Sequence, residues 1–320
     1  MSSDTVINFQ RDMIRAFRFV RCAFDAKTGI AQLVYAFDDG PELTETVTVP
    51  GAPFVLDDAR AAAAERALRL LHLIAGVSYY KAAVPPTIAI DSYAIDADTA
   101  ALLETIYLNG LGEFAYRNGL NLHGRIVFPV GGASAPAAEA IGAEAPPTTV
   151  RALGLSEHAL VAIGGGKDSL VSIEALRSIG VAQTVTWIGG SQLIKVCAER
   201  TGLPMLNLGR QLAPELFEYN RLGAWNGHIP VTAVNSAILV FAAVLIGADQ
   251  VVFSNERSAS YGSFIEGTGE VNHQWSKGWA FEQAFGDHVQ RRIAADPTLK
   301  LDPPKRTPRL HFLDNIDPAT

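Results

Sequence analysis

Residues 159–180 read ALVAIGGGKDSLVSIEALRSIG, and the rest of the chain is understood most easily from this stretch. The apolar run Ala159–Ile163 predicts a short buried strand. Apolar residues then recur at near-helical spacing from Leu170 to Ile179, and Gly180 stands where a helix would end. The sequence therefore predicts a strand, a glycine turn and a helix. This arrangement points free backbone N–H groups and the positive end of a helix dipole at a bound anion.

Three kinds of phosphate-binding loop use such a turn. The loop of the P-loop nucleotide hydrolases is excluded, because Val161 stands where its first glycine belongs and Asp168 where its Ser or Thr belongs. The dinucleotide fingerprint GxGxxG is nearly met by Gly164 and Gly166. It also requires an acidic residue at the end of the next strand, and the segment Thr184–Gly190 offers none.

The third kind is the SGGxDS loop of the PP-loop ATP pyrophosphatase superfamily, which the segment GGGKDS at residues 164–169 resembles closely. The resemblance implies an enzyme that cuts ATP between its α and β phosphates and passes AMP to a substrate oxygen. Gly164 replaces the opening serine of the motif, which removes one hydroxyl donor to phosphate. A glycine turn that only joins a strand to a helix remains the structural alternative.

Length and composition narrow the class of protein. A chain of 320 residues suggests two domains, and 48% hydrophobic residues are ample for a core. A net charge of −7 argues against a nucleic-acid partner. Charges recur from the first residues and no uncharged run has membrane-spanning length, so we expect no membrane association and a cytoplasmic location. Cys22 and Cys197 lie too far apart to suggest a disulfide framework or a metal cluster.

The amino-terminal part predicts a smaller α+β domain over residues 1–130. Its alternating segments indicate an antiparallel meander of three strands, Phe17–Phe24, Ile30–Phe37 and Glu42–Val49, followed by helices at Asp57–Ala75 and Asp98–Asn118. A role in substrate binding or in packing is what we expect of it. Residues 131–150 are rich in Ala, Pro and Gly, which is typical of a linker or a mobile loop.

From Ala159 onward, predicted strands and helices alternate. The strands are Ala159–Ile163, Thr184–Ile188, Met205–Leu208 and Gln250–Ser254, and the helices are Ser169–Ile179, Leu193–Arg200, Pro214–Arg221 and Val231–Ile246. Such alternation is typical of a parallel sheet covered on both faces. The expected fold class is α/β, with a parallel doubly wound sheet of PP-loop type over residues 151–320. Ligands of such sheets bind beyond the carboxyl ends of the strands.

A second polar stretch, Ser254–Glu282, follows directly after the last predicted strand. It reads SNERSASYGSFIEGTGEVNHQWSKGWAFE and gathers hydrogen-bonding groups beside aromatic ones. The stretch Trp225–Asn235, WNGHIPVTAVN, is also polar and precedes a very apolar helix. Solvated helix residues and an ordinary helix cap at Asn272 are the structural alternative.

Taken together, GGGKDS, GHIPVTAVNSAI, VFSNERSAS and VNHQWSKGWAFE resemble the MurL family, the ATP-dependent UDP-N-acetylmuramoyl-L-alanyl-L-glutamate epimerases of bacterial peptidoglycan synthesis. The likeness is specific through residues 159–282 and weaker over the meander. It implies that the terminal L-Glu of UDP-MurNAc-L-Ala-L-Glu becomes D-Glu, while ATP and Mg²⁺ are used and AMP and pyrophosphate are released. The family implies a longer chain, so either this protein is short or the sequence is truncated after residue 320.

The resemblance also implies roles for individual residues. Matched by motif, the residues that line the ATP phosphates are Gly164, Gly165, Gly166, Asp168 and Ser169. Asp168 is expected to meet the phosphates through Mg²⁺, because a bare carboxylate would repel them. Lys167 occupies a variable position of the motif and is a weaker candidate for ATP binding. Trp187 and Gly189 follow the next strand and are candidates to flank adenine.

The candidates for binding the glutamyl group and moving its proton are Glu256, Arg257, His273 and Lys277. Arg257 suits a carboxylate clamp, and His273 can change protonation near neutral pH. His228 is a lesser candidate, and which residue is the base stays open.

Three other functions compete with this one. Another PP-loop enzyme would adenylate a base in tRNA or activate an acid for amide formation, although the acidic net charge argues against the tRNA version. A non-catalytic ATP-binding module would bind the nucleotide without turnover. An NAD(P)-dependent oxidoreductase lacks its acidic ribose ligand here.

Overall fold

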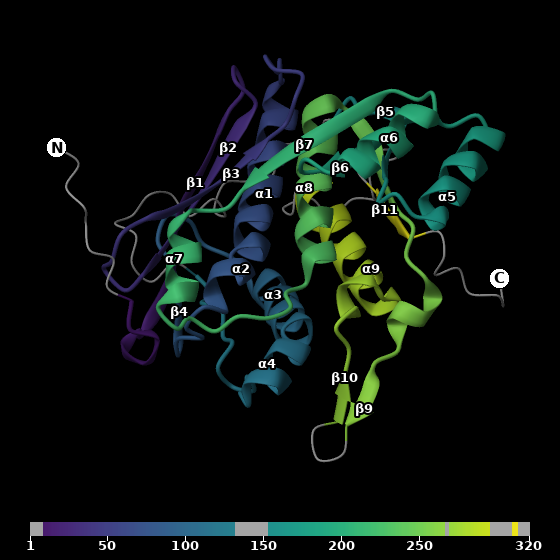
Figure 1. The fold of residues 1–320 in the computed structure, drawn as a ribbon. Coiled ribbons are helices and arrows are strands. Elements are labelled where there is room, and N and C mark those ends of the chain that lie inside the picture. Colours follow the sequence, from purple (N-terminus) through teal and green to yellow (C-terminus); the bar gives the residue numbers. More distant parts are fainter. Residues whose placement is uncertain (1–8, 132–152, 266–268, 295–308, 313–320) are drawn as a thin grey trace.

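The computed structural model describes residues 9–131, 153–265, 269–294 and 309–312. Within these residues the strands form one nine-stranded sheet, in the order β11-β8-β5-β6-β7-β3-β2-β1-β4 (Figure 1). Its strands are β1 Ala16–Asp25, β2 Ile30–Phe37, β3 Leu43–Thr48, β4 Thr87–Ile90, β5 Ser156–Ala162, β6 Ala182–Ile188, β7 Met205–Gln211, β8 Ala248–Phe253 and β11 Arg309–Phe312. A separate hairpin pairs β9 Ser263–Ile265 with β10 Gly269–Val271.

The helices cover this sheet and connect its strands. They are α1 Asp58–Ala75, α2 Val77–Tyr80, α3 Ala97–Gly110, α4 Gly112–Asn118, α5 Lys167–Ser178, α6 Gln192–Arg200, α7 Glu215–Arg221, α8 Val231–Ile246 and α9 Trp279–His288. Short helical turns lie at η1 Arg11–Met13, η2 Arg257–Ser260, η3 Trp275–Lys277 and η4 Val289–Ala294. Among the described helices, none combines the length and the hydropathy that crossing a bilayer requires.

The sheet has two parts with different strand directions. Strands β1, β2 and β3 are an antiparallel meander, as the alternating sequence predicted. Strands β11, β8, β5, β6 and β7 are all parallel to one another. The predicted fold class, a parallel doubly wound sheet beside an antiparallel meander, is therefore confirmed.

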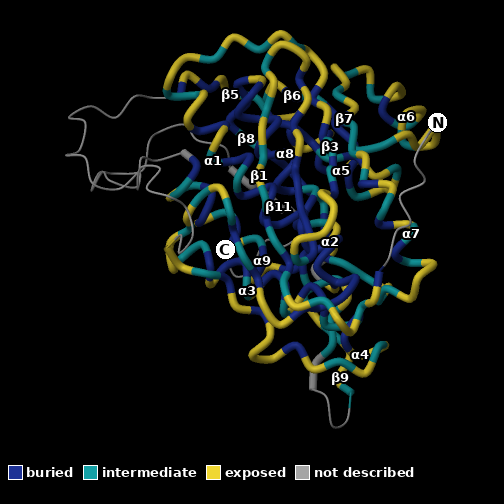
Figure 2. Tube along the Cα trace, turned by 90° about the vertical axis from the view of Figure 1, so that its left-hand side faces the viewer, coloured by how far each residue is buried: buried dark blue, intermediate teal, exposed yellow. Residues whose placement is uncertain are grey.

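Alternate residues of β5 point to opposite faces of the sheet, and both faces are covered, which explains why its second half, residues 159–162, is apolar throughout. Val161 lies in the hydrophobic cluster that α5 and α6 form with one face, and Ile173 of α5 belongs to the same cluster. Leu160 lies in the larger core on the other face, which includes most of α8. Figure 2 shows the buried trace running along α8 through the middle of the molecule.

One junction joins the meander to the parallel strands. Strand β3 pairs antiparallel with β7, and Val47 lies opposite Arg210. The Nε of Arg210 donates to the carboxylate of Glu45 at 2.7 Å, and its Nη2 donates to the hydroxyl of Ser78 at 3.0 Å. Burial alone would lower the pKa of Arg210, but the charge and hydrogen bond of the fully buried Glu45 raise it. The junction is thus held by main-chain pairing and by a buried ion pair.

This continuous sheet bears on the predicted domain boundaries. One large hydrophobic core includes residues from both segments, such as Leu71 of α1 and Leu239 of α8. The predicted linker, residues 131–150, lies outside the described residues apart from Gly131. The division into residues 1–130, 131–150 and 151–320 therefore stays a prediction.

One expected helix differs in the structure. The helix predicted over Asp98–Asn118 is two helices, α3 and α4, which meet at Leu111. A Cβ at Gly110 would lie 2.5 Å from the ring of Pro230, so the close approach of this segment to the start of α8 explains a glycine there. The polar stretch after β8 is not a simple loop, because it contains η2, the β9–β10 hairpin, η3 and the start of α9.

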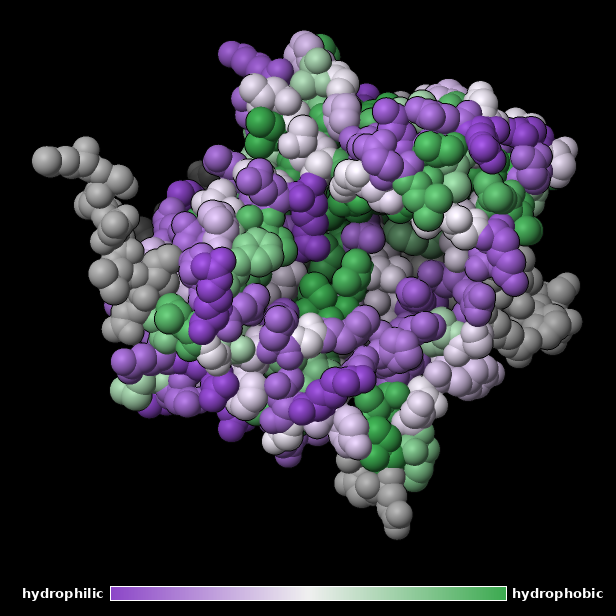
Figure 3. Space-filling view, in the orientation of Figure 1, coloured by the Kyte–Doolittle hydropathy of each residue, from purple (hydrophilic) through white to green (hydrophobic). Residues whose placement is uncertain are grey.

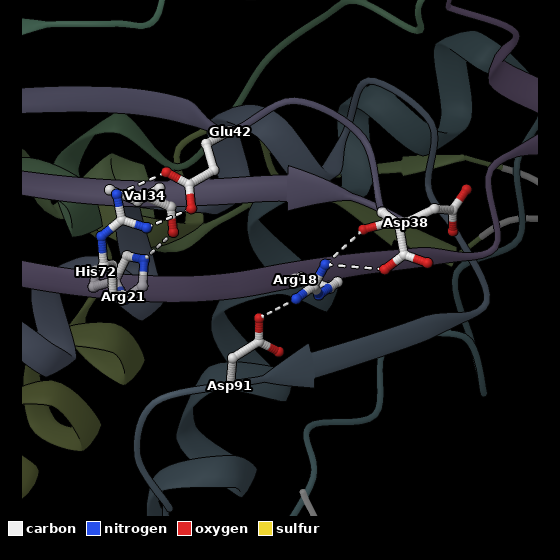
Figure 4. A network of polar contacts seen from close by, with 8 residues as sticks. Arg18, Arg21, Val34, Asp38, Glu42, His72 and Asp91 are labelled. Carbon is white, nitrogen blue, oxygen red and sulfur yellow. Dashed lines mark hydrogen bonds and ion pairs between the residues drawn. The ribbon is translucent and has the colours of Figure 1, made fainter. Parts of the chain in front are cut away.

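Polar contacts fix the meander to its neighbours (Figure 4). Arg18 of β1 donates to the carboxylate of Asp91, which follows β4, at 2.7 Å. His72 of α1 contacts the carbonyl of Val34 through Nε2 at 3.0 Å, and its Nδ1 lies 2.8 Å from the hydroxyl of Tyr93. A carbonyl only accepts, so Nε2 carries the proton and Nδ1 accepts from Tyr93. Burial lowers the pKa of His72 to about 4, so this histidine is a neutral packing residue at physiological pH.

The junction between β3 and β7 generates a stability prediction. Arg210→Met leaves the carboxylate of Glu45 buried without its partner, so we expect a loss of about 3–5 kcal/mol in the free energy of unfolding. Urea unfolding, followed by circular dichroism, measures this loss. The double variant Glu45→Leu/Arg210→Met removes both charges and should regain most of it, since two apolar side chains replace the pair.

The matched control is Arg221→Met. Arg221 also forms an ion pair, with Glu218, but this pair is exposed to solvent. Exposed pairs contribute about 0–1 kcal/mol. A loss for Arg210→Met no larger than that for Arg221→Met would contradict the role given to the buried pair.

Candidate functional site

The glycine turn between β5 and α5, residues 164–166, leaves open space in front of the helix, and we call it the glycine cradle. Gly165 has a φ of +81°, a conformation that side-chain-bearing residues rarely adopt. Gly166 is the N-cap of α5, and no side chain caps this helix end. A Cβ at Gly164 or at Gly166 would meet nothing within 4 Å. Open space therefore lies before the first turn of α5, whose N–H groups lack helical partners.

A cavity of about 390 Å³ begins at this turn. Residues at the carboxyl ends of β5, β6 and β8 line it, together with the first turns of α5 and α8. The strand order reverses at β5, which has β6 on one side and β8 on the other. In doubly wound sheets this switch point is where ligands bind. Figure 3 shows a hollow on this face of the molecule.

Three buried polar atoms at the cavity have no hydrogen-bond partner among the described residues. They are Oγ1 of Thr186, Nε1 of Trp187 and Nδ2 of Asn255. Thr186 is fully buried, and the other two residues are less than a tenth exposed. Buried polar groups in proteins normally have partners. The cavity is therefore suited to a ligand that carries both hydrogen-bond donors and acceptors.

The structure brings most of the predicted ATP-binding residues to this cavity. Those that line it are Gly164, Gly166, Asp168, Ser169 and Trp187. Gly165 shapes the turn behind it, whereas Lys167 is exposed and does not line the cavity. The N–H of Gly189 donates to the carbonyl of Leu208 at 2.9 Å, so this glycine joins the ends of β6 and β7. The roles of all these residues in ATP binding remain predictions.

The site also contains polar residues that the sequence analysis did not select individually. Thr232 and Asn235 lie three residues apart on the first turns of α8, and both line the cavity. Residues at this spacing share one face of a helix. Both belong to the polar segment WNGHIPVTAVN, so the polarity of that segment was the feature of the sequence that indicated them. Asn255 and Ser254 follow β8, and the Oγ of Ser254 lies 2.6 Å from the Oγ of Ser172 in α5.

Of the candidates for proton transfer whose side chains the structure describes, none of Glu256, His273 and Lys277 lines this cavity. Glu256 is exposed and accepts a hydrogen bond from Ser258 at 3.1 Å. Arg257 begins η2, but its side chain lies outside the part of the chain that the structure describes. Lys277 ends η3, and His273 lies in the turn between β10 and η3.

Asn272 holds this region together rather than serving only as a helix cap. Its Nδ2 donates to the carbonyl of Ala259 in η2 at 2.9 Å, and its Oδ1 accepts from the N–H of Gln274 at 2.8 Å. The turn that carries His273 is thereby tied to the segment that leaves the cavity after β8.

His273 faces a second histidine, the lesser candidate His228. The two ring centroids are 5.9 Å apart and the rings are nearly perpendicular. Burial lowers the pKa of His228; Glu113 opposes the shift, and the positive field of His273 and Lys277 adds to it. His228 precedes α8, whose first turns line the cavity. The neutral imidazole of His228 therefore lies beside that of His273, and His228 is close in sequence to the α8 residues that line the cavity.

Comparisons with known proteins agree with this architecture. The model of the MurL N-terminal domain family matches residues 8–299. A curated relative from Xanthomonas oryzae pv. oryzae, named UDP-N-acetyl-alpha-D-muramoyl-L-alanyl-L-glutamate epimerase, is 74% identical over 288 residues, which cover 90% of this chain and 61% of the relative. A relative of the same name from Salinispora tropica is 40% identical over 300 residues, which cover 92% of this chain and 63% of the relative.

The chain thus spans 61% and 63% of the lengths of these two relatives. No solved structure matches it. A family model that covers nearly the whole described chain, and relatives aligned over nine tenths of it, establish the family that the motifs indicated. The chain belongs to the MurL N-terminal domain family.

Proposed function

We propose that this chain forms the ATP-binding part of an enzyme that epimerises the terminal L-Glu of UDP-MurNAc-L-Ala-L-Glu to D-Glu through an acyl-adenylate, in peptidoglycan precursor synthesis. The observation that carries the proposal is the cavity at the switch point of the sheet, which begins at an open glycine cradle. The names of the relatives support the epimerase activity and the substrate. The use of ATP is supported by the shape of the loop and by its likeness to the PP-loop motif.

In this proposal ATP lies in the cavity with its phosphates at the cradle. The backbone N–H groups at the start of α5 donate to phosphate oxygens, and Gly164 and Gly166 leave the space that they occupy. Asp168 lines the cavity and would hold a Mg²⁺ ion, whose charge would offset that of the phosphates. The unpaired polar atoms of Trp187 and Asn255 are suited to the base and the ribose.

The chemistry explains why ATP is needed. The α-proton of glutamate is hard to remove because the carbanion would form beside a carboxylate. When a carboxylate oxygen attacks the α-phosphorus of ATP, pyrophosphate leaves and the acyl group becomes a mixed anhydride. A base then removes the α-proton, since the enolate oxygen can carry the charge. An acid returns a proton to the other face, and water cleaves the acyl–phosphate bond, which releases AMP and leaves a terminal D-Glu on the substrate.

Inversion requires two proton-transfer groups on opposite faces of the α-carbon. We assign these roles to His228 and His273, because the two rings lie close together and burial favours the neutral form of His228; an α-carbon placed between the rings would require them to separate when the substrate binds. Glu256, Arg257 and Lys277 remain candidates for contacting the glutamyl carboxylate and for assisting the proton transfer.

The decisive experiment is one incubation of the chain in D₂O with ATP, Mg²⁺ and UDP-MurNAc-L-Ala-L-Glu. We expect D-Glu with one deuterium at Cα, together with AMP, after hydrolysis of the product. AMP without D-Glu would support activation of the acid but contradict epimerisation by this chain alone. Intact ATP would contradict the proposal.

The cradle generates a prediction for ATP affinity. Gly166→Ala keeps an allowed backbone, since the φ of Gly166 is −92°, but its methyl group enters the space given to phosphate. We expect ATP affinity to fall about tenfold or more, which corresponds to roughly 1.4 kcal/mol. Isothermal titration calorimetry measures the affinity, and urea unfolding should show a change of less than about 1 kcal/mol.

The matched control is Gly112→Ala at the start of α4, where a Cβ would also meet nothing within 4 Å. This variant should bind ATP as the unaltered chain does. Equal ATP affinity in the two alanine variants would rule out the cradle as the phosphate site.

The histidine pair generates a prediction for pH dependence. Because burial lowers the pKa of His228, its base form persists at lower pH than that of a free histidine, and activity should decline only below pH ~6.5. His228→Asn should remove this decline and slow deuterium exchange at Cα by about 100-fold or more. Exchange of labelled pyrophosphate into ATP should change by less than about twofold, since it precedes proton transfer.

His123→Asn is the control, because His123 is exposed and does not line the cavity. If His228→Asn exchanged deuterium as fast as this control, His228 would not be a proton-transfer residue.

A further inference from the structure

A buried cation lies away from the cavity and has no described role. Lys81 follows α2 and is only 7% exposed. Its Nζ donates to Oδ1 of Asn226 at 2.8 Å. Among the described residues no carboxylate forms an ion pair with it, and an ammonium group has three protons to donate. Two donors of a buried charge are therefore left for another acceptor.

A second cation with little exposure, Arg210, differs from Lys81 because its charge is compensated. Arg210 pairs with the carboxylate of Glu45 and also donates to Ser78. Lys81 has only a neutral amide oxygen, and burial lowers its pKa to about 8. An uncompensated buried charge destabilises a folded protein. Because the buried ammonium group of Lys81 lowers the stability of the fold, its presence favours a role in binding an anion.

The segment over Lys81 is held in place by several contacts. The N–H of Trp225 donates to the carbonyl of Ala82 at 2.8 Å. Nδ2 of Asn118 donates to the carbonyl of Asn226 at 3.2 Å, and the Oδ1 that contacts Lys81 also accepts from the N–H of Gly227 at 2.9 Å. Asn226 is thereby oriented by its neighbours, and it in turn positions the ammonium group.

The same segment leads directly to the wall of the cavity. After Gly227 come His228 and then Pro230, which packs against Gly110 in α3. Helix α8 begins at the next residue, and its Thr232 lines the cavity. Figure 1 shows the chain between α7 and α8 passing from the side of α2 to the near end of α8. One short segment, residues 225–230, therefore connects Lys81, His228 and the cavity.

We propose that Lys81 forms a second anion subsite, separate from the cavity at the glycine turn, which binds an anionic oxygen group of the substrate. The identity of the ligand rests on the proposed function, since UDP-MurNAc-L-Ala-L-Glu carries both a diphosphate and carboxylates. With the anion bound, the charge of Lys81 is compensated and its free donors are used. Residues 225–230 then form the path along which an elongated nucleotide sugar reaches from this subsite to the histidine pair.

The test compares Lys81→Met with the unaltered chain by calorimetry, using UDP, the dipeptide L-Ala-L-Glu and ATP as separate probes. We expect affinity to fall tenfold or more for UDP if the subsite takes the diphosphate, or for the dipeptide if it takes a carboxylate. ATP affinity should change less than about twofold. The melting temperature should stay the same or rise, because the variant removes an uncompensated buried charge.

Two further variants sharpen the test. Lys81→Gln keeps a hydrogen-bond donor without the charge and should lose the same affinity as Lys81→Met. Lys195→Met removes a half-exposed lysine that lies 3.9 Å from Glu199, and it should bind every probe normally.

The inference is overturned if the unaltered chain and Lys81→Met bind UDP and the dipeptide equally, or if neither probe binds the unaltered chain at millimolar concentration. A drop in melting temperature with unchanged affinity would also overturn it, since Lys81 would then be structural. These binding results do not depend on turnover. Loss of UDP binding in Lys81→Met would support the subsite even if the D₂O incubation gave no D-Glu.

Discussion

The pairing of β3 with β7 is the interaction on which the rest of the architecture depends. It makes one sheet from an antiparallel meander and a set of parallel strands. These two sets of strands come from different parts of the sequence. The ion pair of Arg210 with Glu45 lies at this junction and is shielded from water. A carboxylate at this place is tolerated only because its partner comes from the other part of the sheet. The two parts are therefore required for each other's stability.

The position of α8 follows from that junction. This helix is packed between the parallel strands and α1, so its sides are buried and its polar residues gather at its first turns. Thr232 and Asn235 are consequently held against the carboxyl ends of β5 and β8. Each wall of the cavity thus belongs to an element fixed by the core, and only the glycine turn is shaped by local backbone preferences. The ligand would meet a site that is largely formed before it binds.

Local patterns in the sequence predicted much of this structure. Strand β2 and helix α8 have the predicted bounds, because hydrophobic periodicity and glycine stops depend on nearby residues alone. The break between α3 and α4 was missed, since it reflects the approach of Gly110 to Pro230, more than a hundred residues away. The cavity residues of α8 and the isolation of Lys81 depend on tertiary contacts for the same reason. Polarity marked the start of α8 but did not show which side chains converge, and no sequence pattern marked Lys81.

The continuous sheet also restricts how the protein can move. Many two-domain enzymes close over their substrates by rotating about a hinge. Here such a rotation would separate the main-chain hydrogen bonds between β3 and β7 and would expose the Glu45 carboxylate. Any adjustment around a substrate is therefore left to elements outside the sheet, such as the turn before η3 that contains His273. If the proposed reaction takes place here, the cavity at the end of the parallel strands would keep its shape while smaller segments outside the sheet adjust to the substrate.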